Sequence, residues 1–537
     1  MEKLRKTIYD VLVFIISLCI TGSISVSNVK TKDTSHVKLT VDETSMQQEI
    51  AGWGAAAAWW PQVAGASDNA EEITKLLFSK EGLGLNIYRF NVGAGEKQNP
   101  DSRLDRDSWK STESFLVYNE KTGKYEYDWS QDAESMKILD LAMSYGCVDS
   151  VVLFSNSPHF SMTVTGQASG GFKKHQNNLK PECYQEYVDY FLDITEHFIE
   201  LGYPVKYISP VNEPQASWGG DHVAQEGCHY DTEELFKLYR LFAKSIKARG
   251  LDVKLSMCEV SKITSKTFDY LKYIYNDPEL REVLGTYAYH AYWSDINYFL
   301  KGWWGKYIKK FPGVIYDMSE WCELPVTMSN KSTRSALFMA RVMAQDMFIS
   351  NASIWSAWVA VSEGDEYGDG LIIANHDCSE FYVAQRYYAM AHFSKFVPEG
   401  SRLISCTKDV NDRFSSRSRE KLESYMSFRT NTAAFLTPDG KIVLVIVNGG
   451  EEHTFSLNGI EGRDRLKTYT TDGNRKVELT YDGEYRQTLT IPAYSITTAI
   501  FEEPHTPQKC LQHGKSCPRD SLGRIFCVYG AKTGNCG

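Results

Sequence analysis

The sequence lacks an excess of basic residues. Over 537 residues the formal net charge is -10, and the pI is about 5.7. Binding a nucleic-acid backbone needs clustered lysine and arginine, so this balance argues against a nucleic-acid partner. Aromatic residues, by contrast, are plentiful at 13%. The composition is that of a folded globular protein, and neutral or weakly charged ligands remain open.

Long hydrophobic runs are also missing, since no run after residue 20 approaches the length of a membrane span. The N-terminus carries Lys3, Arg5 and Lys6, then an apolar stretch over 11–20, then small residues to Ser25. This layout predicts a signal peptide over 1–25 and a secreted protein with no membrane association after cleavage. An uncleaved anchor or a buried helix is the alternative.

Metal-ligand spacing is absent from the C-terminal tail, which has neither CxxC nor a pair of histidines at ligand spacing. The tail, 504–537, instead holds Cys510, Cys517, Cys527 and Cys536. We interpret it as a linker and a disulfide-rich segment whose pairing the sequence leaves open. The segment is either a module that binds a surface or a glycan, or an inert C-terminal clasp.

No GxGxxG loop opens the first structural unit, which disfavours a doubly wound nucleotide-binding sheet. Short apolar runs instead alternate with amphipathic stretches up to about residue 396, the pattern of a parallel sheet with crossover helices. Eight such runs predict a (β/α)8 TIM barrel within 37–400, with a first strand at 37–41 joining a side β-domain. The eight runs are 50–56, 85–91, 150–155, 205–211, 253–258, 285–291, 314–319 and 352–358.

From 401 to 503 the pattern changes to short alternating strands with turn pairs between them. These pairs predict a β-sandwich. They are Pro438-Asp439-Gly440, Asn448-Gly449-Gly450, Asp472-Gly473-Asn474 and Asp482-Gly483.

Two glutamates end predicted barrel strands, where the active sites of TIM barrels lie. Glu213, in an Asn-Glu-Pro tripeptide, follows the fourth strand, and Glu320 follows the seventh. Glycosidic bonds are hydrolysed by two carboxyl groups, and a separation of about 5 Å implies retention of configuration. An isolated Asn-Glu-Pro is as compatible with a structural turn as with catalysis, but two glutamates at two strand ends point to a glycosidase.

Several stretches around these glutamates resemble glycoside hydrolase family 30 of clan A, over roughly residues 45 to 500. They are Gly52-Trp53-Gly54-Ala55, the segment 85–93, Ser155-Asn156-Ser157-Pro158, Asn178-Leu179-Lys180-Pro181, the two glutamate motifs and the segment 392–397. The resemblance implies a barrel with a side β-sandwich, Glu213 as general acid/base and Glu320 as nucleophile. It also implies a polysaccharide or glycan substrate and neither a metal nor an organic cofactor.

Further site residues follow from the same comparison. Asn212 is expected to bind the sugar 2-hydroxyl. Arg89 is expected to orient Glu320 and keep it ionised, with a purely structural ion pair as the alternative. Tyr292 or His290 would hydrogen-bond the nucleophile. Trp358 would form a sugar platform, whereas Trp355 faces the core. Glu259 and Glu323 are expected to be solvated loop carboxylates.

Three features are similar to the endo-β-1,6-galactanase branch of the family: the double tryptophan Trp59-Trp60, the loop containing Asn156, and Gln225-Glu226-Gly227-Cys228-His229. We therefore expect Trp60 and Asn156 to contact substrate and the activity to be cleavage of β-1,6-galactan. The alternatives are β-1,6-glucan, xylan or exo-acting β-glycosidase specificity within the family, and a catalytically silent carbohydrate-binding protein on the same scaffold.

Overall fold

The computed structural model describes residues 36–503 except 222, 296–297, 325–327, 365–367 and 410–429. The predicted signal peptide and the cysteine-rich tail lie outside these residues. Within the described part, no helix is both long enough and apolar enough to cross a bilayer.

Eight parallel strands close into a barrel in chain order, the last pairing with the first. Each corresponds to one of the eight predicted runs, so the (β/α)8 barrel is confirmed. The first of them is buried along its whole length and pairs through Ala55 with Ala357. The strands are β2 (Gly52–Ala57), β3 (Ile87–Asn91), β6 (Ser150–Phe154), β7 (Val205–Ser209), β8 (Lys254–Val260), β9 (Leu284–His290), β10 (Ile315–Trp321) and β11 (Ala352–Ala357).

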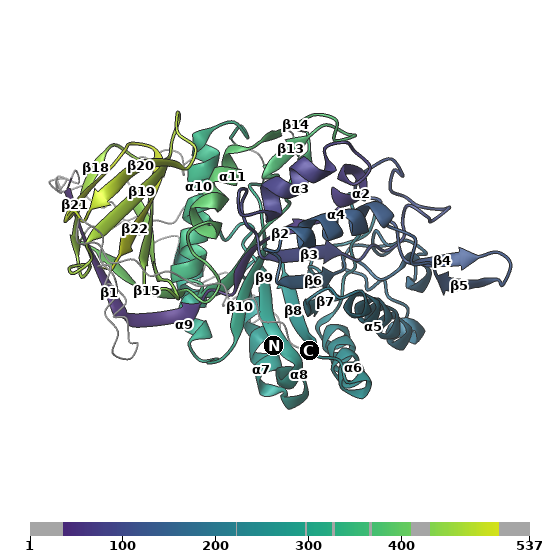
Figure 1. The fold of residues 1–537 in the computed structure, drawn as a ribbon. Coiled ribbons are helices and arrows are strands. Elements are labelled where there is room, and N and C mark those ends of the chain that lie inside the picture. Colours follow the sequence, from purple (N-terminus) through teal and green to yellow (C-terminus); the bar gives the residue numbers. More distant parts are fainter. Residues whose placement is uncertain are drawn as a thin grey trace, which may run out of the picture.

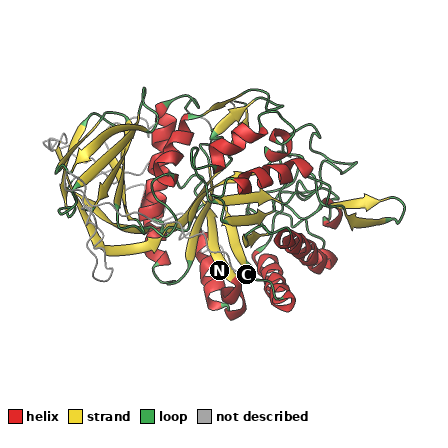
Figure 2. Cartoon of the chain, in the orientation of Figure 1, coloured by secondary structure: helices red, strands yellow, loops and turns green. Residues whose placement is uncertain are grey.

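Helices surround the barrel (Figures 1 and 2). Their sequences are amphipathic, as in α5, where Tyr187, Phe191 and Phe198 are buried against the strands. A 3-10 turn that starts at Pro181 leads into α5, because the fixed φ of proline suits the first turn of a helix. The helices are α2 (Pro61–Ala64), α3 (Ala70–Phe78), α4 (Ala133–Ser144), α5 (Tyr184–Glu200), α6 (Thr232–Arg249), α7 (Ser265–Asn276), α8 (Pro278–Val283), α9 (Tyr298–Ile308), α10 (Thr333–Phe348) and α11 (Gln385–Ser394).

Two small sheets extend the barrel. The hairpin β4 (Leu116–Asn119) and β5 (Lys124–Tyr127) lies in the connection between β3 and α4. The second sheet, after β11, consists of β12 (Val361–Glu363), β13 (Ile372–Ala374) and β14 (Phe381–Val383). Both lie in connections that follow barrel strands, which is where TIM barrels place their variable, functional loops.

A separate β-sandwich is built from one nine-stranded sheet of order β20-β19-β22-β17-β16-β15-β1-β18-β21. Its core joins side chains from distant strands, including Val37, Ile446, Leu466 and Phe501. The pair Asp482-Gly483, predicted as a turn, lies inside β20, so that prediction is wrong. The strands are β1 (His36–Glu49), β15 (Arg402–Lys408), β16 (Thr430–Leu436), β17 (Ile442–Asn448), β18 (His453–Asn458), β19 (Arg465–Thr471), β20 (Glu478–Glu484), β21 (Thr488–Ile491) and β22 (Ser495–Glu502).

The barrel and the sandwich meet along α10 and α11 (Figure 1). His392 of α11 is buried there and hydrogen-bonds the hydroxyls of Thr471 and Thr498, each at 2.8 Å. Burial lowers the pKa of His392 to about 3, so the ring stays neutral. The His392 contact that joins the two units is therefore buried and uncharged.

Candidate active site

The two predicted catalytic glutamates lie together at the carboxyl ends of β7 and β10. One oxygen of Glu213, one oxygen of Glu320 and one ring nitrogen of His290 all lie within 4.8 Å of one another. Glu320 is fully buried, whereas the Glu213 side chain is 15% exposed. This spacing is the one that allows one carboxylate to attack a sugar while the other exchanges a proton with the departing oxygen.

Arg89, at the middle of β3, binds Glu320 directly. Its Nη1 donates to Glu320 Oε1 at 2.7 Å, and its Nη2 lies 3.3 Å from Glu259 Oε1. The guanidinium also covers the Phe154 ring at 3.7 Å. The predicted contact between Arg89 and Glu320 is therefore present, and a buried arginine held on three sides fixes the orientation of that carboxylate.

Glu259 is a site residue that the sequence prediction got wrong. It was expected to be solvated, but it is completely buried within β8 and accepts hydrogen bonds from Ser209 at 2.8 Å and from Ser319. Burial raises its pKa, but the charges of Arg89 and His290 outweigh that effect and lower it to about 2. The predicted run ended at residue 258, but the apolar Val260 that follows Glu259 extends β8 and was the signal for burial.

Glu323 is a second such correction. It was also expected in solvent, yet it is fully buried. Its Oε2 accepts a hydrogen bond from Ser335 at 3.3 Å and lies 3.7 Å from Arg386. These partners come from α10 and α11, so Glu323 ties the end of β10 to the surrounding helices.

His290, at the end of β9, lies between three carboxylates. Its Nδ1 is 3.1 Å from Glu213 and 3.4 Å from Glu320, and its Nε2 is 3.1 Å from Glu259. Burial alone would lower the pKa of His290, but the negative charges of Glu320, Glu213 and Glu259 raise it to about 10. The imidazole is therefore a cation at neutral pH.

The spacing of Glu213, His290 and Glu320 would suit a metal ion, but the positive charge of His290 opposes metal binding. A protonated imidazole cannot ligate a metal, and Arg89 adds a second positive charge beside Glu320. The donor set therefore fits a charge-balanced cluster of carboxylates and cations better than a metal centre.

Burial is the largest influence on the ionisation of Glu320. Burial raises its pKa above the ordinary glutamate value, against the opposing effect of His290 and Arg89. Tyr292 Oη lies 3.5 Å from Glu320 Oε2 on the remaining side. Tyr292 and His290 therefore both reach the carboxylate that the sequence assigned as nucleophile.

A row of asparagines adjoins Glu213. Asn212 Nδ2 donates to Asn156 Oδ1 at 3.1 Å, and Asn156 Nδ2 donates to Asn91 Oδ1 at 3.2 Å. The Asn212 Oδ1 atom is buried and accepts no hydrogen bond from the described residues. An oriented amide with a free acceptor suits a hydroxyl donor on a ligand.

The division of the tryptophans between the site and the core differs from the prediction at one residue. Trp358 packs edge-on against Trp59, with ring centroids 5.1 Å apart, and its backbone N–H bonds to Trp321, next to Glu320. Trp60, predicted to contact substrate, is completely buried and donates to the Ala56 carbonyl at 3.2 Å, so that prediction is wrong. Trp59 is the member of the pair beside the site. Trp355 faces the core and donates to Asp346 at 3.2 Å, as expected.

Left-handed backbone conformations gather at these strand ends. Trp59, Glu213, Cys258, Glu259 and Trp293 have φ values of 73°, 44°, 87°, 43° and 57°. Non-glycine residues in this region are strained, and such strain is concentrated at functional sites. At Trp59 the reversal explains why consecutive tryptophans point to different environments.

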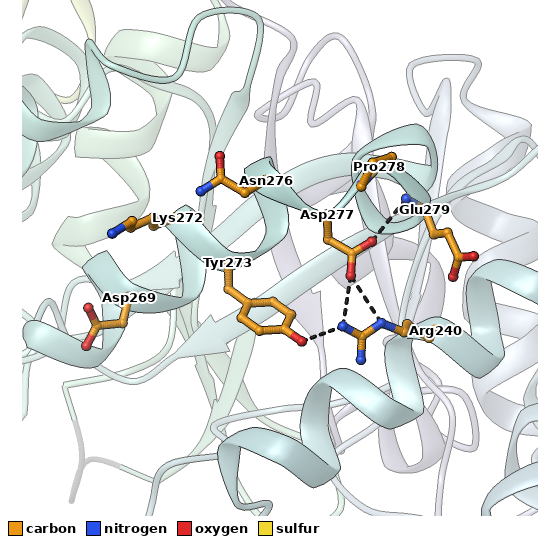
Figure 3. A pocket seen from close by; sticks show the side chains of 8 residues that line it. All are labelled: Arg240, Asp269, Lys272, Tyr273, Asn276, Asp277, Pro278 and Glu279. Carbon is orange, nitrogen blue, oxygen red and sulfur yellow. Dashed lines mark hydrogen bonds and ion pairs between the residues drawn. The ribbon is translucent and has the colours of Figure 1, made fainter.

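A separate hollow lies among the outer helices of the barrel. It is lined by residues of α6, α7 and α8, including Arg240, Tyr273 and Asp277, where α7 ends and the chain turns back towards the start of β9 (Figure 3). That end of a TIM barrel serves stability rather than catalysis.

Two family models match the chain. The family model described as O-Glycosyl hydrolase family 30 matches residues 36–373, and the model of the family 30 β-sandwich domain matches residues 423–499.

Among curated relatives, an endo-β-1,6-galactanase from Hypocrea rufa is 24% identical over 447 residues, which cover 78% of this chain and 83% of the relative. A glucuronoxylanase from Bacillus subtilis is 25% identical over 393 residues, covering 70% of this chain and 78% of the relative. Among solved structures, a conserved exported protein from Bacteroides fragilis is 26% identical with a TM-score of 0.75, covering 86% of this chain and all of that one.

Proposed function

Because the chain belongs to glycoside hydrolase family 30, and is a glycoside hydrolase acting on β-glycans, we propose that Glu213 and Glu320 cleave its substrate by double displacement with retention. The observation that carries this proposal is that oxygens of the two carboxylates lie within 4.8 Å of each other. A retaining mechanism needs this short spacing, whereas an inverting one needs room for a water molecule between the carboxyl groups.

In the first step an ionised Glu320 oxygen would attack the anomeric carbon while Glu213 gives its proton to the departing glycosidic oxygen. In the second step Glu213 would take a proton from water, and that water would release the sugar from Glu320. Arg89 and Tyr292 would hold Glu320 in line, and Asn212 would accept a hydrogen bond from a sugar hydroxyl.

His290 gives this scheme an electrostatic rationale. Negative charge leaves Glu320 when it forms the glycosyl bond and appears on Glu213 when that residue loses its proton. The Nδ1 of His290 lies 3.1 Å from one carboxylate and 3.4 Å from the other, so a single cation compensates the charge in either place.

For the substrate we propose β-1,6-galactan. An endo-β-1,6-galactanase matches 78% of this chain, and the sequence resemblance in the segment 225–229 points the same way. The glucuronoxylanase match favours xylan as the second candidate. The N-terminal segment supports the further proposal that the enzyme is secreted, which N-terminal sequencing of the mature protein tests.

The first test compares wild type with Glu320→Gln on β-1,6-galactan, with released reducing sugar as the readout. Loss of the nucleophile is expected to lower kcat by about a thousandfold or more. Glu380→Gln, a change at an exposed glutamate, serves as the control and should leave activity intact. Equal activity of wild type and Glu320→Gln would refute the assigned roles.

Two further measurements separate the remaining alternatives. Proton NMR of the first product should show the β-anomer, and an initial α-anomer from a β-linked substrate would refute retention. A panel of β-1,6-galactan, β-1,6-glucan and glucuronoxylan with product sizing identifies the substrate and separates endo from exo action. A wild type that binds these glycans but cleaves none would be a carbohydrate-binding protein instead.

A further inference from the structure

The hairpin β4–β5 extends from the end of the barrel that carries the two glutamates (Figure 1). It belongs to the connection that follows β3, and such connections lie on the catalytic side of a TIM barrel. Two-stranded ribbons are only marginally stable alone. A projecting ribbon is therefore expected to be stabilised by what it contacts.

One face of this hairpin is aromatic. Tyr118 lies directly opposite Tyr125, and Leu116 lies directly opposite Tyr127. Because side chains alternate along a strand, these two pairs share one face of the ribbon. The other face is polar, where Glu126 accepts hydrogen bonds from Asn119 and Thr122 on the neighbouring strand and turn.

The base of the aromatic face is fixed to the barrel. Tyr127 donates to Asp193 of α5 at 2.7 Å, and its ring stacks on Trp129 at 4.8 Å with an interplanar angle of 3°. Trp129 in turn stacks on His197 at 3.9 Å. The tip is the most open part, because Tyr118 is 56% exposed and Tyr125 is 38% exposed, while Tyr127 and Trp129 at the base are 36% and 37% exposed. Their rings are 5.3 Å apart.

The open rings are connected to the active site through the loop after β6, by residues that are themselves buried. The Tyr125 ring packs against His159 at 5.3 Å and Phe160 at 6.0 Å. Those two residues lie in the loop after β6, which also carries Asn156, and Asn156 binds Asn212, the neighbour of Glu213. The exposed rings of Tyr125 and Tyr118 therefore lie beyond the outer part of a loop whose inner part adjoins Glu213, and a glycan bound over this loop would meet them.

The size of the open patch decides between partners. A stable protein partner needs about 800 Å² of surface on each side, far more than two tyrosine rings supply. A sugar ring, in contrast, presents a face of C–H groups that packs on a single aromatic ring, and the tyrosine hydroxyls can bond its edge. The two most exposed rings therefore suit a glycan chain as their ligand.

We propose that Tyr118 and Tyr125 form a remote subsite that holds the polysaccharide several sugar residues away from the bond that is cleaved. The subsite makes the enzyme select long chains over short ones. This inference rests on the proposed function, because it takes the glycan bound at Glu213 and Glu320 as its ligand.

The test measures kcat and KM of Tyr118→Ala on β-1,6-galactan and on a β-1,6-linked galactotriose too short to reach the hairpin. Loss of one stacking ring is expected to raise KM for the polymer about 3- to 10-fold while kcat and the trisaccharide kinetics stay unchanged. Tyr118→Phe, which keeps the ring, should behave almost as wild type. Lys124→Ala, on the polar face, is the matched control and should have no effect.

Three results would overturn the inference alone: an unchanged KM for the polymer, an equal loss on polymer and trisaccharide, or the same loss in Tyr118→Phe as in Tyr118→Ala. An equal loss would mean that the ring only supports the fold. If wild type hydrolyses neither substrate, nor the β-1,6-glucan and glucuronoxylan of the panel, the proposed function fails and this inference fails with it. If wild type is active on a different polymer, the same comparison is made with that polymer and its trisaccharide.

Discussion

His290 carries much of the charge balance of the site. Three carboxylates, Glu213, Glu259 and Glu320, surround it, and Arg89 is the second cation. Each buried carboxylate is tolerated because a cation lies within hydrogen-bonding distance or close to it. The ionisation of Glu320 therefore depends on a histidine that is not itself assigned a bond-making role.

This dependence predicts a shift in the pH profile of His290→Gln. Glu320 must be ionised to attack, so activity is lost as the pH falls through its pKa, which already lies above the ordinary value. Removing the nearby positive charge raises that pKa further, and the acid limb of kcat/KM should move up by about one to two pH units. Measurements of kcat/KM across the acid and neutral range test this.

His376→Gln is the control for that profile, since His376 pairs with the exposed Glu363. Its acid limb should match that of wild type. An acid limb of His290→Gln that stays in place or moves to lower pH would contradict the assigned charge balance.

The sequence predicted which residues belong to the site better than it predicted how deeply side chains are buried. Six predicted residues lie beside the two glutamates or connect to them: Arg89, Asn156, Asn212, His290, Tyr292 and Trp358. Apart from Arg89, which lies in the middle of β3, their positions followed from strand ends, which a sequence reveals. Glu259 and Trp60 were misplaced because burial depends on neighbouring strands, and because the left-handed backbone at Trp59 reverses the side-chain direction.

Among the elements, α8 is short and depends on its N-cap residue, Asp277. Asp277 accepts hydrogen bonds from the N–H groups of Glu279 and Leu280, and it also binds Arg240 of α6, whose guanidinium contacts Tyr273 as well (Figure 3). The helix leads directly into β9, which ends at His290. One carboxylate thus caps a helix and joins two helices on the stability side of the barrel.

Asp277→Ala is therefore expected to lower stability without lowering the chemical rate. Loss of the cap costs about 1 kcal/mol, and the partly exposed ion pair adds about 0–1 kcal/mol. The midpoint of thermal unfolding should fall while kcat stays within about twofold. Lys272→Ala in the same hollow should leave the midpoint unchanged. A large fall in kcat with an unchanged midpoint would contradict a purely structural role.

The barrel strands were predictable because each is an apolar run bounded by polar residues. The hairpin β4–β5 was missed, although the alternation Lys124-Tyr125-Glu126-Tyr127 is typical of a strand with one polar face. Its pairing is local and its exposed rings give no apolar run. Asp482-Gly483 was mistaken for a turn because its pairing with β19 is tertiary information.

Across the whole molecule, several buried acids hold protons well above their usual pH. Burial raises the pKa of Asp132, Glu226 and Asp317 to about 8 each. In the unfolded chain the same groups titrate near pH 4. Between these values the folded state binds more protons than the unfolded state, so the free energy of unfolding falls as the pH rises.

We therefore expect the unfolding midpoint to decrease as the pH is raised from about 5 to about 8, and the decrease to be smaller in Glu226→Gln. That side chain accepts from Thr112 at 2.7 Å, and Glu96 adds like charge beside it. The pKa of Glu259 is lowered to about 2, so the stability it adds is lost only as the pH falls from about 4.5 towards 2. Glu380→Gln is the control, and a midpoint that rises with pH would refute the expectation.

The place of β1 in the sandwich has a consequence for synthesis on the ribosome. This strand begins the described chain, yet it lies inside the sheet between β15 and β18, and Lys38 bonds to Asp409 across 371 positions. At about 5–20 residues per second, translation of that interval takes about 20–70 s. During that time β1 has emerged without either partner, so the nascent chain exposes two unpaired strand edges that a holding chaperone would have to shield.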